Sequence, residues 1–124
     1  MKVGKEELCG IAAAVEWSLG RDYVALARRY EDDVRTVIDA VRDVPGVTAF
    51  RTWPSESGQP MARARIIVSD GARLDRDTLL KRLDEGHPRI EVWPYGPDGF
   101  HVNPQTLQPG EATTIGDVLR RHLA

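Results

Sequence analysis

The spacing of apolar residues changes once along this chain, and the change restricts the folds open to it. From Lys5 to about Arg42 the apolar residues recur every three or four positions, which is typical of amphipathic helices. From Val47 to Val68 they alternate with polar residues or cluster as β-branched and aromatic ones, which is typical of strands. We therefore expect an α+β protein whose helices cover one face of a mainly antiparallel sheet.

Residues that favour helix ends and turns set the predicted boundaries. The predicted helices span residues 5–19, 22–42, 75–84 and 111–123. Gly20 would end the first helix, and Asp22 would cap the second. The predicted strands span residues 47–53, 62–68, 90–93 and 100–102, and they pair as two hairpins. The expected element order is α-α-β-β-α-β-β-α.

Size, charge and cysteine content exclude several classes of protein. At 124 residues and 13.8 kDa the chain fits one domain. The net charge of −2 argues against direct nucleic-acid binding, which needs a basic surface. Cys9 is the only cysteine, so no internal disulfide can form and a reducing compartment is expected. No apolar run approaches the roughly 20 residues of a membrane span, and we expect a cytoplasmic protein.

Histidine and cysteine give no complete site for chemistry. His87, His101 and His122 lack the spacing of metal ligands with Cys9 or with paired carboxylates, so we interpret them as surface or capping residues. His122 falls in a last helical turn, where a cation suits the helix dipole. Cys9 follows Leu8 in an apolar pattern, and we favour a packed side chain over a reactive thiol.

Arginines are the more informative polar residues. Arg63 and Arg65 are two positions apart on a predicted strand, so they share one face, and Arg89 opens another predicted strand. Each guanidinium could clamp a carboxylate or phosphate, or lie on a solvated face beside a residue such as Glu91. The loop with Ser55, Ser57 and Gly58 could hold an anion through backbone N–H groups, although Glu56 within it would repel phosphate. No nucleophile–base pair, metal cluster or cofactor loop is evident.

Two longer stretches resemble a known enzyme family. The first is the opening, MKVGKEELCGIAAAVE, and the second is HPRIEVWPYGPDGFHVNPQTLQPGEATTIGDVLRRHL with its core NPQTLQPGE. With VPGVTAF between them, they resemble the C-terminal part of the fold-type-I pyridoxal-phosphate enzymes of the selenocysteine synthase (L-seryl-tRNA selenium transferase) type. This group includes class-V-type aminotransferases and sugar-acid ammonia-lyases of the D-glucosaminate-6-phosphate type. The resemblance covers the chain from Lys2 to Leu123.

The resemblance implies that 1–124 is a C-terminal small domain, with residues 1–43 as a helical junction and 44–124 as an α+β sandwich. The large domain that carries the Schiff-base lysine and holds pyridoxal phosphate would lie upstream of this chain. Lys2, Lys5 and Lys81 do not match that lysine, so no catalytic, cofactor-binding or metal-binding residue is assigned and no cofactor is expected on this chain alone. A small domain of this type supplies an arginine for the substrate carboxylate. Arg89 is the first candidate, although the family pattern more often has proline there, and Arg65 is the second.

Three hypotheses follow. In the first, the chain is one part of a transferase or lyase, inactive alone, contributing a cleft wall and homo-oligomer contacts through its N-terminal helices. It predicts an uncovered apolar surface that packs on the large domain, with these members: Ile11, Ala12, Val15, Tyr30 and Val34. On this view Met1 is an internal methionine, or the gene is truncated or split. In the second, the chain is a free-standing non-catalytic module that dimerises or binds a small ligand. In the third, it is a decayed reading frame without function.

Overall fold

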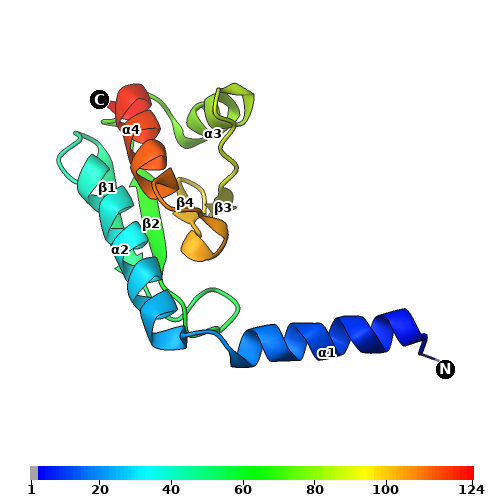
Figure 1. Cartoon of the computed structure of the whole chain (residues 1–124). Coiled ribbons are helices and arrows are strands. Elements are labelled where there is room, and N and C mark those ends of the chain that lie inside the picture. Colours follow the sequence, from blue (N-terminus) through cyan, green and yellow to red (C-terminus); the bar gives the residue numbers. More distant parts are fainter. Residues whose placement is uncertain (1–2) are drawn as a thin grey trace.

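A computed structural model describes residues 3–124, and it confirms an α+β fold with the predicted element order (Figure 1). Met1 and Lys2 lie outside the described residues. The helices are α1 (Lys5–Leu19), α2 (Tyr23–Val41), α3 (Arg76–Glu85), the short 3-10 helix η1 (Pro104–Thr106) and α4 (Glu111–Leu123). The strands are β1 (Val47–Thr52), β2 (Arg63–Val68), β3 (Trp93–Tyr95) and β4 (Gly99–Val102).

The four strands form one antiparallel sheet in the order β1-β2-β4-β3. The first hairpin pairs Val47 with Val68, as the alternating pattern predicts. Strand β4 joins the two hairpins because it also pairs with β2, placing Arg65 opposite His101. Strand β3 lies at an edge of the sheet, and this position tolerates Pro94, which has no N–H to donate to a further strand.

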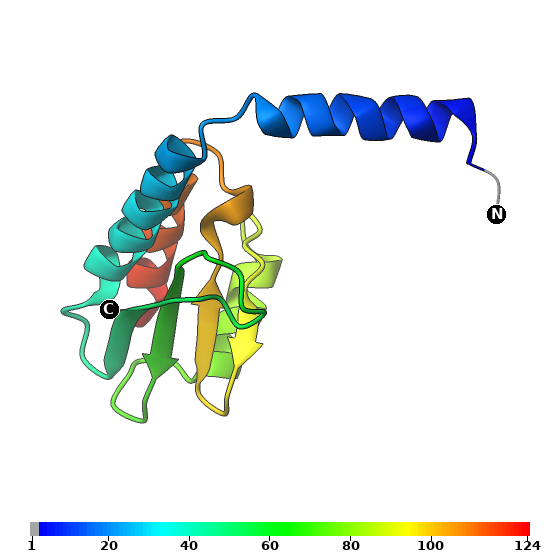
Figure 2. The ribbon, with the colours of Figure 1, turned by 90° about the horizontal axis from the view of Figure 1, so that it is seen from below.

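Three helices cover one face of the sheet, as Figure 2 shows, and the other face is free of helices. Side chains of β2 that alternate toward the helices, such as Ala64 and Ile66, are fully buried. The core is completed by Val37 and Val41 of α2, and by Leu119 of α4. Helix α2, which the sequence prediction assigns to the junction segment, therefore packs into the sandwich.

Helices α2 and α4 approach closely at Gly116. A Cβ atom at this position would lie 2.7 Å from the Cβ of Ala40, closer than two carbon atoms can pack. The contact is reinforced at its end by Arg120, whose guanidinium donates hydrogen bonds to the Ala40 carbonyl at 2.8 Å and to Asp43 at 2.6 Å. The small residue thus sets the separation of the two helices over the sheet.

The predicted strand at residues 90–93 is wrong. Ile90 is buried, but it lies in an irregular segment and its N–H donates to the carbonyl of Leu83 at 2.9 Å. The strand begins only at Trp93, so Arg89 does not open a strand. Alternation of apolar residues in this segment reflects the packing of Ile90 beneath α3, not strand pairing.

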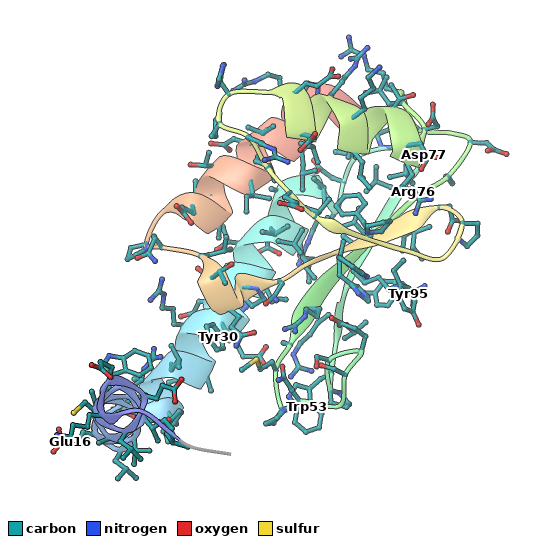
Figure 3. All side chains as sticks on the ribbon, turned by 90° about the vertical axis from the view of Figure 1, so that its right-hand side faces the viewer. Glu16, Tyr30, Trp53, Arg76, Asp77 and Tyr95 are labelled. Carbon is teal, nitrogen blue, oxygen red and sulfur yellow. The ribbon has the colours of Figure 1, made fainter. Side chains whose placement is uncertain are left out.

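Helix α1 lies apart from the rest of the described chain. It extends away from the sandwich in both ribbon views, and none of its residues is buried against the other described residues (Figures 1 and 2). In the end-on view of Figure 3 its side chains radiate around the helix on all sides. Cys9 is exposed, so the prediction that it packs in a core is wrong within this structure. Helix α1 therefore lacks the tertiary packing that stabilises most protein helices, and isolated helices of this length are only marginally stable in water.

Candidate functional site

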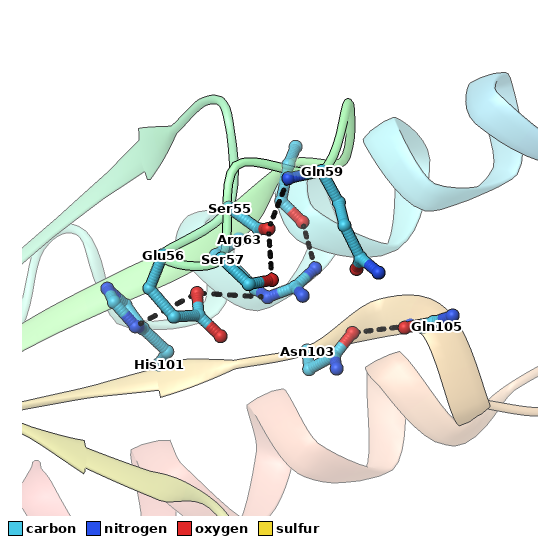
Figure 4. A network of polar contacts seen from close by, with 9 residues as sticks. Ser55, Glu56, Ser57, Gln59, Arg63, His101, Asn103 and Gln105 are labelled. Carbon is cyan, nitrogen blue, oxygen red and sulfur yellow. Dashed lines mark hydrogen bonds and ion pairs between the residues drawn. The ribbon is translucent and has the colours of Figure 1, made fainter.

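The face of the sheet that no described helix covers carries a row of aromatic and basic side chains, and the 53–62 loop lies over part of it (Figure 4). We call it the uncovered face. Because facing residues of neighbouring strands point to the same side, the row can be followed through the register. Phe50 of β1 faces Arg65 of β2, Arg65 faces His101 of β4, and His101 faces Trp93 of β3. One side chain from each strand therefore contributes to a continuous band across the sheet.

Aromatic rings hold Arg65 in place within this band. Its guanidinium carbon lies 4.4 Å from the centre of the Tyr95 ring and 5.7 Å from that of Phe50. Tyr95 also stacks on His101, with ring centres 4.6 Å apart. Such cation–π contacts orient a guanidinium without using its hydrogen-bond donors. Arg65 can therefore present its N–H groups to a ligand.

Arg63 lies beside this band and is almost completely buried, with 3% of its surface exposed. Its Nη1 donates to the neighbouring carbonyl of Ala62 at 3.3 Å, while its buried Nε has no hydrogen-bond partner among the described residues. The nearest opposite charge is Glu56, whose Oε2 lies 3.5 Å from that Nε. A buried charge with so little pairing is costly in free energy.

His101 is also buried, with 5% exposed, so the prediction of a surface histidine is wrong at this position. Neither ring nitrogen has a hydrogen-bond partner among the described residues, and Nδ1 lies 3.7 Å from Glu56. Burial lowers the pKa of His101 below its usual value, and Arg65 and Arg63 lower it further, while Glu56 opposes them. These surroundings favour the neutral form of the ring.

The other two histidines lie outside the band. His87 is exposed, and His122 in the last turn of α4 is partly buried. Burial lowers the pKa of His122, and nearby arginines, Arg82 first, lower it further. This environment disfavours the charged form that the helix dipole would favour.

The connection between β1 and β2 places Glu56 beside the buried side chains of Arg63 and His101 (Figure 4). Within this loop the Ser55 hydroxyl is buried, accepts a hydrogen bond from the Gln59 N–H at 3.1 Å and lies 3.2 Å from the Ser57 hydroxyl. In the loop that the sequence suggested for anion binding through backbone N–H groups, the Ser55 hydroxyl therefore stabilises the loop itself. The side chain of this loop that lies near Arg63 and His101 is that of Glu56, between the two serines.

A cleft of about 380 Å³ opens beside these groups. Its polar lining includes Glu56, Arg63, His101 and Asn103. Its apolar lining comes from Val92 and Trp93 of the β3 segment and from Leu107 and Ile115. A second carboxylate, Glu91, also lines the cleft. The cleft thus combines the buried Arg63 and His101 with two carboxylates and an apolar wall, and small-molecule sites likewise combine apolar walls with a few polar groups.

The two predicted substrate-binding arginines lie in different surroundings. Arg65 belongs to the aromatic and basic band, whereas Arg89 is exposed and its Nε donates to Asp84 at 2.6 Å. This bond raises the pKa of Arg89. Arg89 lines a separate hollow together with Glu91 and Glu111. Arg63 was not singled out as a substrate ligand because its burial depends on the 53–62 loop, which no local pattern reveals.

A second surface of interest is apolar and lies on the N-terminal helices. We call it the docking face, and its members are Leu8, Ile11, Val15 and Leu19 of α1 with Tyr23 and Val24 of α2, each more than half exposed. Of the predicted members, Ile11, Ala12 and Val15 are exposed, but Tyr30 and Val34 are buried in the sandwich, so the prediction is wrong for those two. Tyr30 and Val34 belong to the face of α2 that turns toward the sheet and α4.

Two further observations limit the chemistry of residues 3–124. Among them, no group of three or more histidine, cysteine, aspartate or glutamate side chains is placed to hold a metal ion. No helix in this range combines the length and apolarity needed to cross a membrane.

A comparison with solved structures bears on the whole arrangement. The structure of a D-glucosaminate-6-phosphate ammonia-lyase matches this chain with a TM-score of 0.72 and 26% sequence identity. The chain resembles one part of that lyase. The match covers 98% of this chain, so it takes in most of α1 as well as the sandwich, and it covers 32% of the lyase chain. The chain therefore spans about a third of the length of the protein it matches. No family model matches the sequence.

Proposed function

We propose that this chain is the small domain of a pyridoxal-phosphate enzyme of the selenocysteine synthase-like group, completed by a larger cofactor-binding domain and inactive without it. The observation that carries the proposal is the docking face. An exposed apolar face of this extent marks an interaction surface in a soluble protein. Its presence on a helix that leaves the sandwich, in a chain that matches a third of an ammonia-lyase, supports a missing larger partner.

The residues in hand do not form a site for pyridoxal phosphate. Lys5 and Lys81 are exposed, and neither lines the cleft beside Arg63 and His101. The cofactor, which stabilises carbanions formed next to an amino group, would be held by the larger domain. The contribution of this chain would be one wall of the active-site cleft, and we assign that role to the uncovered face of the sheet.

Within that wall, Arg65 is the better placed of the two proposed substrate ligands. Its guanidinium is oriented by Tyr95 and Phe50, and it can offer two parallel N–H groups to a substrate carboxylate. Arg89 is already paired with Asp84 and would have to exchange that partner. Homo-oligomer contacts through the N-terminal helices are a further part of the proposal, supported by the same docking face.

A free-standing, non-catalytic module is the alternative. It is favoured by the core itself, which is built from residues 34–123 and needs no contribution from α1. In that case the docking face would be satisfied by a second copy of the chain.

The experiment that separates the two is purification of the endogenous protein through an epitope added after Ala124. The proposal predicts about one pyridoxal phosphate per polypeptide, together with release of ammonia or another leaving group from an amino acid or amino sugar acid. An Arg65→Lys variant should raise KM with little change in cofactor content. An endogenous protein without cofactor would favour the free-standing module.

A further inference from the structure

The uncovered sheet face carries an anion site that the chain itself occupies. We propose that the carboxylate of Glu56 is an exchangeable internal ligand over Arg63 and His101, and that it gives up its place to the oxyanion of a small molecule in the cleft. The proposal rests on the geometry of this face and holds whether or not a larger domain completes the protein.

The first argument is that Glu56 lies near Arg63 and His101 without a hydrogen bond to either side chain. Its Oε2 is 3.5 Å from Arg63 Nε and 3.7 Å from His101 Nδ1, and none of these buried nitrogens has a hydrogen-bond partner among the described residues. Buried donors are normally satisfied, and an unsatisfied one calls for an explanation such as a functional role or a bound water or ion. The carboxylate supplies charge, but it leaves the Nε–H of Arg63 without a hydrogen bond.

The second argument is that Glu56 can leave. The Glu56 side chain is 39% exposed, whereas the Arg63 side chain is 3% exposed. Glu56 can therefore move into solvent while Arg63 stays buried. Two residues further along the loop, Gly58 has a positive φ of 78°, and the space where a Cβ would stand is empty. The loop is held at Ser55 by hydrogen bonds with Gln59 and Gly58, but nothing packs against the position of a Cβ at Gly58.

The third argument concerns the ligand. Arg63 and Arg65 carry two positive charges on this face of the sheet, and two carboxylates, Glu56 and Glu91, line the cleft beside Arg63. Withdrawal of Glu56 leaves Arg63 and Arg65 on one face of β2, with Cα atoms roughly 7 Å apart. A guanidinium group can clamp a carboxylate or a phosphate group. The apolar wall formed by Val92, Trp93 and Leu107 would contact the body of the molecule that carries the anion.

The test is a titration of the isotope-labelled 124-residue chain, followed by nuclear magnetic resonance at constant ionic strength. Sodium acetate and inorganic phosphate are used in separate arms, which distinguishes a carboxylate site from a phosphate site. The Nε–H signal of Arg63 reports binding, and the amide of Gly58 reports movement of the loop. Glu56→Gln removes the internal ligand, and Glu85→Gln, an exposed carboxylate at the end of α3, is the matched control.

We expect Glu56→Gln to bind at least one of the two anions about tenfold more tightly than the wild type, which is the gain that corresponds to Glu56 occupying the site in about nine molecules of ten. Glu85→Gln should behave as the wild type. In the wild type, the Arg63 and Gly58 signals should move together during the titration. Equal affinity in the wild type and Glu56→Gln would overturn the proposal, and so would an Arg63 shift without movement of Gly58. An Arg63→Lys change made in Glu56→Gln should abolish the gain. If that double variant does not fold, the Glu56→Gln and Glu85→Gln comparison still decides.

Discussion

Two truncations of apolar side chains test whether the docking face on α1 is left unpacked by the rest of this chain. Leu119 of α4 has no exposed surface, and Ile11 of α1 is 59% exposed. Leu119→Ala removes buried methyl groups and leaves a cavity, which costs about 2–5 kcal/mol of unfolding free energy. Ile11→Ala removes methyl groups that already face water, so we expect a change within about 0.5 kcal/mol.

The assay is denaturation by guanidinium chloride, followed by the fluorescence of Trp53 and Trp93 in a chain whose Trp17 is replaced by Phe. The slope of the free energy against denaturant should be the same for both variants, because neither changes the surface exposed on unfolding by much. The measurement is repeated over a hundredfold range of protein concentration, since self-association through α1 would make stability depend on concentration. A cost above about 1 kcal/mol for Ile11→Ala at every concentration would refute the reasoning, because α1 would then be packed within the monomer.

Three further outcomes follow from the geometry. Gly46 and Gly58 both have positive φ, but a Cβ on Gly46 would lie 2.1 Å from the Ala72 nitrogen whereas the space at Gly58 is empty. Gly58→Ala should therefore cost about 1 kcal/mol and Gly46→Ala about 3 kcal/mol or more in chemical denaturation, and equal costs would contradict the predicted clash. Gly116→Ala should cost about 1–3 kcal/mol because α2 and α4 must separate, and a higher melting temperature would mean that its helix propensity outweighs the contact. The pKa of His101 is lowered on folding, so its neutral form contributes stability that is present above pH 6.5 and declines as the pH falls below that value. Thermal melts at pH 7.5 and 5.5 should differ less for His101→Gln than for the wild type, and an unchanged difference would mean that His101 titrates normally.

Helix boundaries were the part of the fold most accessible from the sequence, because local residues determine them. The predicted spans of α1 and α4 match the structure, and Asp22 caps α2 by accepting hydrogen bonds from Val24 and Ala25 at 3.1 and 3.0 Å. The first hairpin followed from alternation alone. Strand β3 did not, because Ile90 is buried in the core without being part of a strand, and its apolar character resembles that of a strand residue.

The site was only partly accessible from the sequence. Two-residue spacing placed Arg63 and Arg65 on one face, and that placement is correct. Their difference in burial is set by the 53–62 loop, and the position of His101 beside them is set by the pairing of β2 with β4. Both are long-range features that no local pattern encodes. On α1, the hypothesis of a separate large domain predicted an uncovered apolar surface, and Ile11, Ala12 and Val15 are exposed among the described residues.

The most direct test of the account is the mass of the endogenous polypeptide. An antibody raised against residues 22–124 would be used to probe a native cell extract after denaturing electrophoresis. Because the chain covers 32% of the ammonia-lyase that it matches, the account predicts a band about three times heavier than 13.8 kDa. A single band at 13.8 kDa would contradict a large domain in the same polypeptide. If no separate large subunit then copurified with it, the central claim would fail.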